Sequence, residues 1–158
     1  MDSSAHTEGL KLLARRELSV EGVRARLLDR GFDAEAAEAA LVRLQESGAL
    51  DDARVARAYA RTAVTVKGRG RLRVMRELVQ MGVAQDVAAE ALGEVFGDLD
   101  ERSLIAQAVQ KKLRGRTKLA DQHEYARLYQ FLMRQGFSPA GVVAALRRFR
   151  TGIIADQD

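Results

Sequence analysis

The sequence predicts an all-α protein made of three tandem three-helix repeats that stack into an elongated, curved array. Composition is the first reason. The 158 residues include one Pro, few aromatic residues and abundant Ala, Leu, Arg and Glu, which lose little conformational entropy in a helix. No run of alternating β-branched residues indicates a strand. The second reason is an internal repeat, and the hydrophobic content of 47% supports a folded chain with a core.

A motif recurs three times, as LLDRGFDAEAAEAALVRL at 27–44, LVQMGVAQDVAAEALGEV at 78–95 and LMRQGFSPAGVVAALRRF at 132–149. The copies align without gaps on Gly31, Gly82 and Gly136. Each has an apolar pair just before the glycine, an apolar residue after it and a later Ala-Leu pair. This pattern predicts a helix that ends at a left-handed glycine, an apolar residue tucked into the turn, and a second helix.

The first repeat spans about residues 6–47. Gly31 ends its second helix, and Asp33 is the expected N-cap of its third. The predicted helices cover residues 6–16, 19–30 and 33–47.

The second repeat spans about residues 51–95, and Asp51-Asp52 place carboxylates in its first turn, where the helix dipole favours them. Gly68 and Gly70 mark a break, after which Val74, Leu78 and Met81 form one apolar helical face. The predicted helices cover residues 51–65, 70–81 and 84–95.

The third repeat spans about residues 99–149, begins with Leu99-Asp100-Glu101 and has Ser138-Pro139 at the start of its last helix. The predicted helices cover residues 99–114, 121–135 and 138–149, and the tail at 150–158 is left unassigned. Each repeat is too small to fold comfortably alone, so we expect neighbours to stack and share a core.

Charge alternates along the chain in blocks. Residues 54–81 carry eight basic residues and one acidic residue, and residues 111–158 carry ten basic and four acidic residues. Residues 1–53 and 82–110 are net acidic. Such segregation does little for a core, so it indicates surfaces that meet charged partners.

The basic block contains KGRGRLRVMREL at 67–78, which lacks the Gly-Lys-Ser/Thr ending of a phosphate loop. Arg69, Arg73 and Arg76 are spaced to form one exposed helical stripe opposite Val74 and Leu78. A solvated face is the ordinary interpretation of such a stripe. The density of unneutralised charge favours a site for phosphates or an acidic partner. The candidate residues in this block are Arg54, Arg57, Arg61, Lys67, Arg69, Arg71, Arg73 and Arg76.

A second basic cluster ends the helix predicted at 99–114. Cations at that place also complement the negative end of the helix dipole, so both interpretations stay open. The candidate residues are Lys111, Lys112, Arg114, Arg116 and Lys118.

Enzymatic chemistry is not expected. The chain has no Cys, and neither His6 nor His123 stands in a carboxylate and histidine set with metal-ligand spacing. Asp51 and Asp52 are explained by helix capping, and no nucleophile has a convincing base. We expect no cofactor and no metal. The N-terminal residues do not form a signal peptide, and no apolar segment is long enough for a bilayer, so we expect a cytoplasmic protein without membrane contact.

Three segments in order resemble the RecX family of regulatory proteins. They are RRELSVEGVRARLLDRGF at 15–32, SGALDDARVARAYA at 47–60 and KGRGRLRVMRELVQMGV at 67–83. The resemblance covers nearly the whole chain. The third repeat departs from it, because LADQHEYARL at 119–128 replaces the basic lead-in, and no role of that lead-in is carried over.

The resemblance implies a single domain over 1–158 and a bacterial modulator of the RecA recombinase, in recombination, DNA repair and the SOS response. It implies binding to the RecA filament on DNA and inhibition of filament assembly, ATP hydrolysis and strand exchange. We expect a monomer that also contacts single- or double-stranded DNA without sequence preference.

Two other functions remain open. Helix, Gly-apolar turn and helix also describe a helix-turn-helix DNA-binding protein. Its recognition helices would begin DAEAAEAA, AQDVAAEA and SPAGVVAA, which offer few groups for base edges. The third possibility is a passive helical scaffold for another protein.

Overall fold

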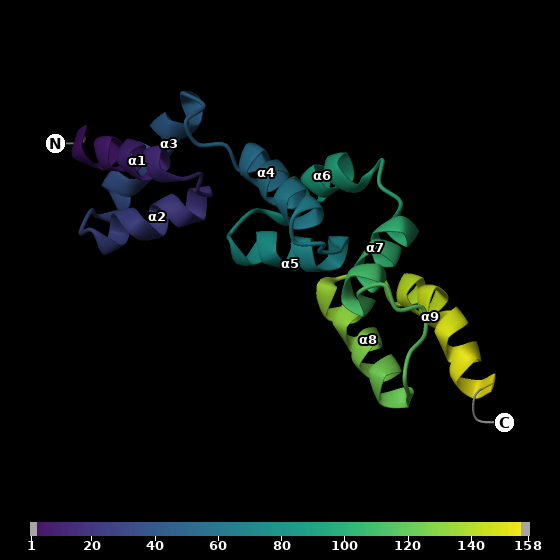
Figure 1. The fold of residues 1–158 in the computed structure, drawn as a ribbon. Coiled ribbons are helices and arrows are strands. Elements are labelled where there is room, and N and C mark those ends of the chain that lie inside the picture. Colours follow the sequence, from purple (N-terminus) through teal and green to yellow (C-terminus); the bar gives the residue numbers. More distant parts are fainter. Residues whose placement is uncertain (1–2, 156–158) are drawn as a thin grey trace. The chain divides into compact units, whose positions relative to one another are not determined.

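The computed structural model describes residues 3–155, and side chains over 5–149, and within these limits it is all-α without a strand (Figure 1). The helices are α1 (Ser3–Arg15), α2 (Val20–Asp29), α3 (Ala34–Glu46), α4 (Asp52–Thr65), α5 (Arg71–Gln80), α6 (Gln85–Phe96), α7 (Glu101–Leu113), α8 (Gln122–Gln135) and α9 (Pro139–Ala155). The all-α prediction is confirmed. The predicted helix bounds agree to within three residues except at the end of α9. That helix continues to Ala155, into the tail left unassigned; the last three residues lie outside the described part.

The chain packs as two compact units. One contains the residues up to Ala60 together with Met75–Gly93, and the other contains Arg61–Val74 together with the residues from Glu94 onward. Helices α4 and α5 of the middle repeat therefore contribute to both units.

The first unit has a core formed by α1, α2 and α3. Its most buried side chains recur at helical spacing, which places them on the inner faces of the three helices. They include Val23, Leu27, Ala37, Leu41 and Leu44, all at most 1% exposed. Ser19 and Asp33 cap α2 and α3 by accepting hydrogen bonds from Gly22 N and Ala36 N, which confirms the predicted role of Asp33.

The second unit has a core formed by α7, α8 and α9, which includes Ile105, Val109, Leu128, Leu132, Phe137, Val142, Leu146 and Phe149. Asp100 and Asp121 cap α7 and α8. Glu101, which follows Asp100, accepts hydrogen bonds from Ser138 N at 2.7 Å and Ser138 Oγ at 2.9 Å. The first turn of α7 is thereby tied to the start of α9.

The three repeated glycines have the predicted left-handed backbone, with φ of 93° at Gly31, 88° at Gly82 and 98° at Gly136. At each turn the glycine N–H donates to the carbonyl three residues back, and the next N–H donates to the carbonyl five residues back. These two bonds define a Schellman motif. The first residue of each apolar pair is buried (Leu27, Leu78 and Leu132), and so are Val83 and Phe137 after the glycine. The second residue of the pair is exposed at Leu28 and Val79 and half-buried at Met133, and Phe32 is also half-buried.

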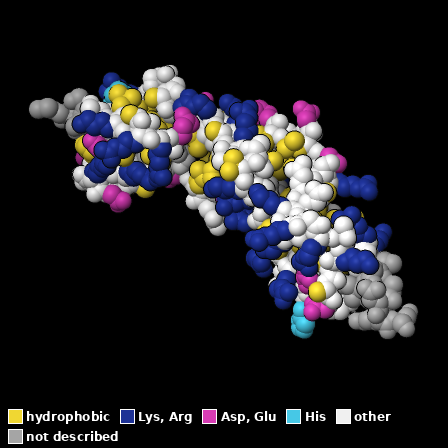
Figure 2. All heavy atoms as spheres, viewed as in Figure 1, with side chains coloured by type: hydrophobic (Ala, Val, Ile, Leu, Met, Phe, Trp, Pro, Cys, Tyr) yellow, Lys and Arg dark blue, Asp and Glu magenta, His cyan; other side chains and the backbone are white. Residues whose placement is uncertain are grey.

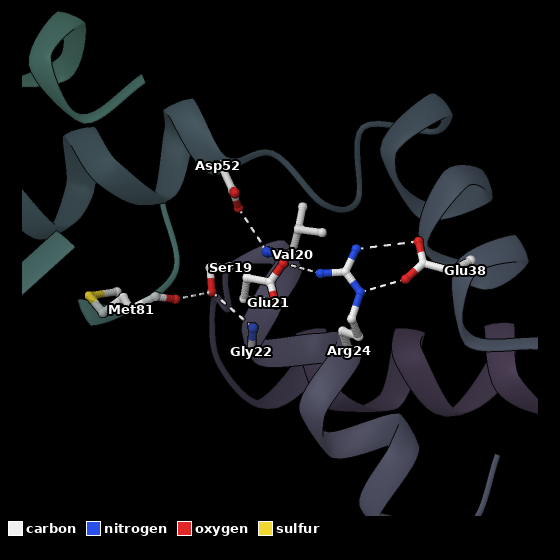
Figure 3. A network of polar contacts seen from close by, with 8 residues as sticks. All are labelled: Ser19, Val20, Glu21, Gly22, Arg24, Glu38, Asp52 and Met81. Carbon is white, nitrogen blue, oxygen red and sulfur yellow. Dashed lines mark hydrogen bonds and ion pairs between the residues drawn. The ribbon is translucent and has the colours of Figure 1, made fainter. Parts of the chain in front are cut away.

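The turn at Gly82 supports the beginning of α2 in the first unit (Figure 3). Ser19 Oγ donates to Met81 O at 2.7 Å while it caps α2. The neighbouring Val20 N donates to Asp52 Oδ1 at 2.8 Å. Burial raises the pKa of this Asp52 carboxyl, although the bond from Val20 opposes the shift. The start of α2 is thus held by the Asp52 carboxylate of α4 and by the carbonyl of Met81, which lies in the turn after α5.

The turn at Gly136 supports the beginning of α5 in the second unit in a corresponding way. Gly70 N donates to Gln135 O at 2.7 Å, and Leu72 N donates to Gly136 O at 3.0 Å. Gly70 is buried, and a Cβ placed on it would lie 2.5 Å from the carbonyl carbon and oxygen of Gly136. The glycine predicted to mark a break before the helix therefore also allows two backbones to touch.

Glycine-to-alanine substitutions should separate two reasons for glycine at these turns, the left-handed backbone and the close approach of another helix start. At Gly31 a Cβ would meet nothing within 4 Å, so Gly31→Ala should cost only the left-handed strain, about 1–2 kcal/mol. At Gly82 and Gly136 a Cβ would overlap the Cβ atoms of Glu21 and Arg73, so each substitution should cost a further ~1–3 kcal/mol. Urea unfolding of the three variants measures the difference. Equal losses at all three sites would show that the helix starts are not tightly seated.

Leucines of the repeated Ala-Leu pair should be equally sensitive in all three repeats. Leu41, Leu92 and Leu146 are at most 1% exposed, so truncation to alanine should destabilise the fold by roughly 2–5 kcal/mol in each case. Chemical denaturation monitored by circular dichroism tests this. A loss below about 0.5 kcal/mol at one position, within the range of ordinary surface substitutions, would contradict the register of that repeat.

Candidate nucleic-acid and partner interface

Among the basic residues of α4 in the first unit, Arg54 is engaged in contacts within the protein. Arg54 pairs with Glu17, with Nε to Oε1 at 3.0 Å, and donates to Gly48 O at 2.9 Å and Ala49 O at 3.1 Å. Arg54 and Arg57 are half-buried. Arg54 therefore fastens the loop before α4, so its charge is directed at the protein rather than outward.

The predicted stripe of Arg69, Arg73 and Arg76 is not uniform. Arg76 is exposed as expected, whereas Arg69 and Arg73 are half-buried. Arg73 Nη1 donates to Gln135 Oε1 at 2.9 Å, because α5 begins on the turn that ends α8. The expectation that all three heads lie in solvent was therefore wrong for Arg73, and Arg69 is half-buried as well. Arg61, Lys67 and Arg71 are exposed.

The second basic cluster lies at the end of α7 and in the loop that follows. Lys111, Lys112, Arg114, Arg116 and Lys118 are all exposed. Arg114 ends α7 with φ of 51°, the only left-handed residue other than glycine in the described chain. Lys112 Nζ lies 4.5 Å from the centroid of the Phe131 ring, a cation–π contact with α8.

One carboxylate lies within this cluster. Arg116 pairs with Glu124, which also accepts a hydrogen bond from Ala120 N at 2.8 Å. The Arg116 contact, followed by the Ala120 bond, lowers the pKa of Glu124, and the same contact raises the pKa of Arg116. Glu124 therefore stays ionised and its charge is met locally.

A groove of about 360 Å³ lies between the end of α7 and α8. Its cationic lining consists of Lys112, Arg116, Arg127 and Arg134. Arg127 and Arg134 are not among the residues predicted from the sequence. Both new residues are exposed. The available signal was their spacing of seven residues, which repeats on one helical face around Phe131. They were missed because this segment lacks the dense basic run of the second repeat.

Helix α8 brings the two basic clusters of the second unit to its opposite ends. The Arg116–Glu124 pair lies at its first turn. At its last turn, Gln135 Nε2 donates to the carbonyls of Lys67 and Gly68 at 3.4 Å, beside the backbone bond from Gly70. Lys and Arg side chains, dark blue in Figure 2, gather over α8. Clusters about forty residues apart in sequence, such as Arg71 and Lys111, thus flank one helix of about 21 Å.

The fold defines the chain as a helical-repeat protein of three tandem three-helix domains. Three family models match it in order: the first, second and third three-helix domains of RecX, at residues 5–44, 51–92 and 100–146. The chain belongs to the RecX family, as the sequence resemblance predicted.

Relatives match over most of their length. The regulatory protein RecX of Pelodictyon phaeoclathratiforme is 33% identical over 143 residues, which cover 90% of this chain and 87% of the relative. That of Halorhodospira halophila is 38% identical over 136 residues, covering 86% and 82%. The crystal structure of RecX from Lactobacillus salivarius has the same fold, with a TM-score of 0.79 at 14% identity over 95% of this chain and 97% of that one. None of the described helices is long and apolar enough to cross a membrane.

Arg71 and Arg73 offer a direct test of which arginines serve the fold. Arg73→Glu should lower the free energy of unfolding by about 1–2 kcal/mol, because the hydrogen bond to Gln135 is lost and an acceptor faces an acceptor. Arg71→Glu makes the same charge change at an exposed position and should stay within about 0.5 kcal/mol of the parent. Thermal and urea unfolding measure both. A loss at Arg71 as large as at Arg73 would contradict this division.

Proposed function

We propose that this chain is a negative regulator of the RecA recombinase, which binds the RecA filament on DNA and inhibits filament assembly, ATP hydrolysis and strand exchange. The observation that carries the proposal is membership of the RecX family across all three domains in order. The proposal places the chain in the cytoplasm, as a monomer, in recombination and DNA repair.

The charge distribution supports this proposal physically. A filament on DNA presents both phosphates and protein, so a regulator gains from a basic surface that meets the first and other surfaces that meet the second. The second unit carries exposed basic residues at both ends of α8, including Lys67, Arg71, Lys112 and Lys118. Binding of this kind needs no catalytic group.

Sequence-specific reading by a helix-turn-helix is less well supported. The helices that follow the glycine turns would have to enter the major groove with their first turns. Helix α3 has Glu35 in its first turn, and α6 has Asp86 there. Glu38 is held by Arg24, with Nε to Oε1 at 2.5 Å. Carboxylates at these places repel phosphates and cannot donate to guanine.

Steady-state ATP hydrolysis by RecA on single-stranded DNA tests the proposal. Added protein should reduce the rate severalfold at well below one copy per RecA protomer. The reason is that a bound molecule that stops filament growth also affects protomers that it does not touch. A coupled spectrophotometric assay over a titration of the protein gives both values.

Two controls give this test its force. Adding the protein to preformed filaments and to free RecA separates disassembly from blocked assembly. Excess free single-stranded DNA should not restore the rate of ATP hydrolysis. If inhibition requires one copy per RecA protomer and disappears with excess DNA, simple competition for DNA explains it better. A helical scaffold without this function would leave the rate unchanged.

A further inference from the structure

We infer that the groove between the end of α7 and α8 binds single-stranded nucleic acid, with Arg127 and Arg134 contacting successive parts of its phosphate backbone. This assignment does not require that the chain inhibits RecA. It concerns Arg127 and Arg134, to which the sequence resemblance assigned no role, and Arg127 lies in the segment 119–128 where the third repeat departs from the family.

Charge is the first argument. Lys112, Arg116, Arg127 and Arg134 line the groove against one carboxylate, Glu124. Glu124 is only 14% exposed and is held by Arg116 and Ala120 N. Among the side chains of residues 5–149, no ion pair to a carboxylate engages Lys112 or Arg134. The lining therefore keeps a positive excess that a polyanion would neutralise.

Spacing is the second argument. Arg127 and Arg134 are two helical turns apart on α8, about 10 Å along its axis. Both lie along the same groove, with Phe131 between them. A row of cations along a rigid helix follows an extended chain of phosphates, whereas a single small anion would need cations that converge on one point.

The floor of the groove favours a single strand over a duplex. Phe131 is half-buried and is the accessible apolar side chain of this floor, with the Lys112 ammonium over its ring, whereas Leu113 and Leu128 line the groove as buried core residues. Unpaired bases have apolar faces that can lie against such a floor, as they do on the aromatic surfaces of single-strand binding proteins. A duplex presents phosphates to a surface of this kind and keeps its base faces stacked inside.

Further basic residues at both ends of the groove extend the surface available to a nucleic-acid strand. Beyond Arg134, Gln135 holds the loop that carries Lys67 and, further along, Arg69 and Arg71. Beyond Arg116 lies Lys118. A nucleic-acid strand bound along α8 would therefore contact cations at both ends of the groove as well as inside it.

Fluorescence anisotropy of labelled oligothymidylate, with no RecA present, tests the inference. The double variant Arg127→Glu with Arg134→Glu should bind at least tenfold more weakly than the parent. Each phosphate contact to a single strand contributes about 0.7 to the slope of log affinity against log salt, so losing two should flatten the slope by about 1.4. The matched control is Arg102→Glu with Arg148→Glu, which makes the same change in net charge at exposed positions of α7 and α9. It should lose less than threefold.

Several outcomes would overturn the inference. Unchanged affinity and slope in the groove variant would do so, as would an equal loss in the control, which would indicate bulk charge only. A labelled duplex that binds as tightly as the single strand, with the same loss, would contradict the single-strand assignment. Loss of RecA inhibition with unchanged DNA affinity would instead assign the groove to an acidic protein segment. Circular dichroism of both variants checks that they fold. If the parent protein binds oligothymidylate through the groove but does not inhibit RecA, only the proposed function is refuted.

Discussion

The structure depends on one backbone constraint, the seating of a helix start on the glycine turn that ends a later helix. At Gly82 the partner is the first turn of α2, and at Gly136 it is the first turn of α5. In each case N–H or O–H donors at a helix start meet carbonyls at a helix end, so opposite ends of two helix dipoles come together. A side chain at either glycine would prevent this contact. Gly31 has the same left-handed turn, with open space around its Cα, so its glycine is needed for the turn alone.

The same constraint positions the charged surface. Because Gly70 is held against Gln135 and Gly136, the loop that carries Lys67 lies at the end of α8. Because Glu124 accepts from Arg116 and Ala120, the loop after α7 lies at the start of α8. Helix α8 is itself fixed by Leu128 and Leu132 in the core. The basic clusters of the second unit therefore owe their placement to backbone contacts, to one buried helical face and to two arginine contacts, Arg73 with Gln135 and Arg116 with Glu124.

Sequence periodicity was sufficient for the helices, the glycine turns and the buried columns, because each of these is set by residues close in sequence. Leu41, Leu92 and Leu146 occupy one aligned position and share one environment. The site was harder to predict, since whether an arginine head is free depends on residues far away. Arg73 looks exposed on its own helix, and only its contact with Gln135, 62 positions later, shows otherwise. Arg127 and Arg134 form a groove only when α7 ends beside them. The end of α9 was missed because the tail TGIIADQD carries no capping signal that would place it.

Four carboxylates of the second unit bind donors within the protein, which favours a basic surface on this unit. Asp100 and Asp121 cap helices, Glu101 binds Ser138, and Glu124 binds Ala120 N and Arg116. Each of these acids satisfies backbone or hydroxyl donors that would otherwise be unpaired, so it supports a helix start. Glu124 also lines the groove with Arg127 and Arg134. A net charge of +4 for the whole chain therefore understates the field above α8. Fold stability and partner binding draw on different charges in this unit, which is why reversing arginines in the groove can alter binding while the helices remain intact.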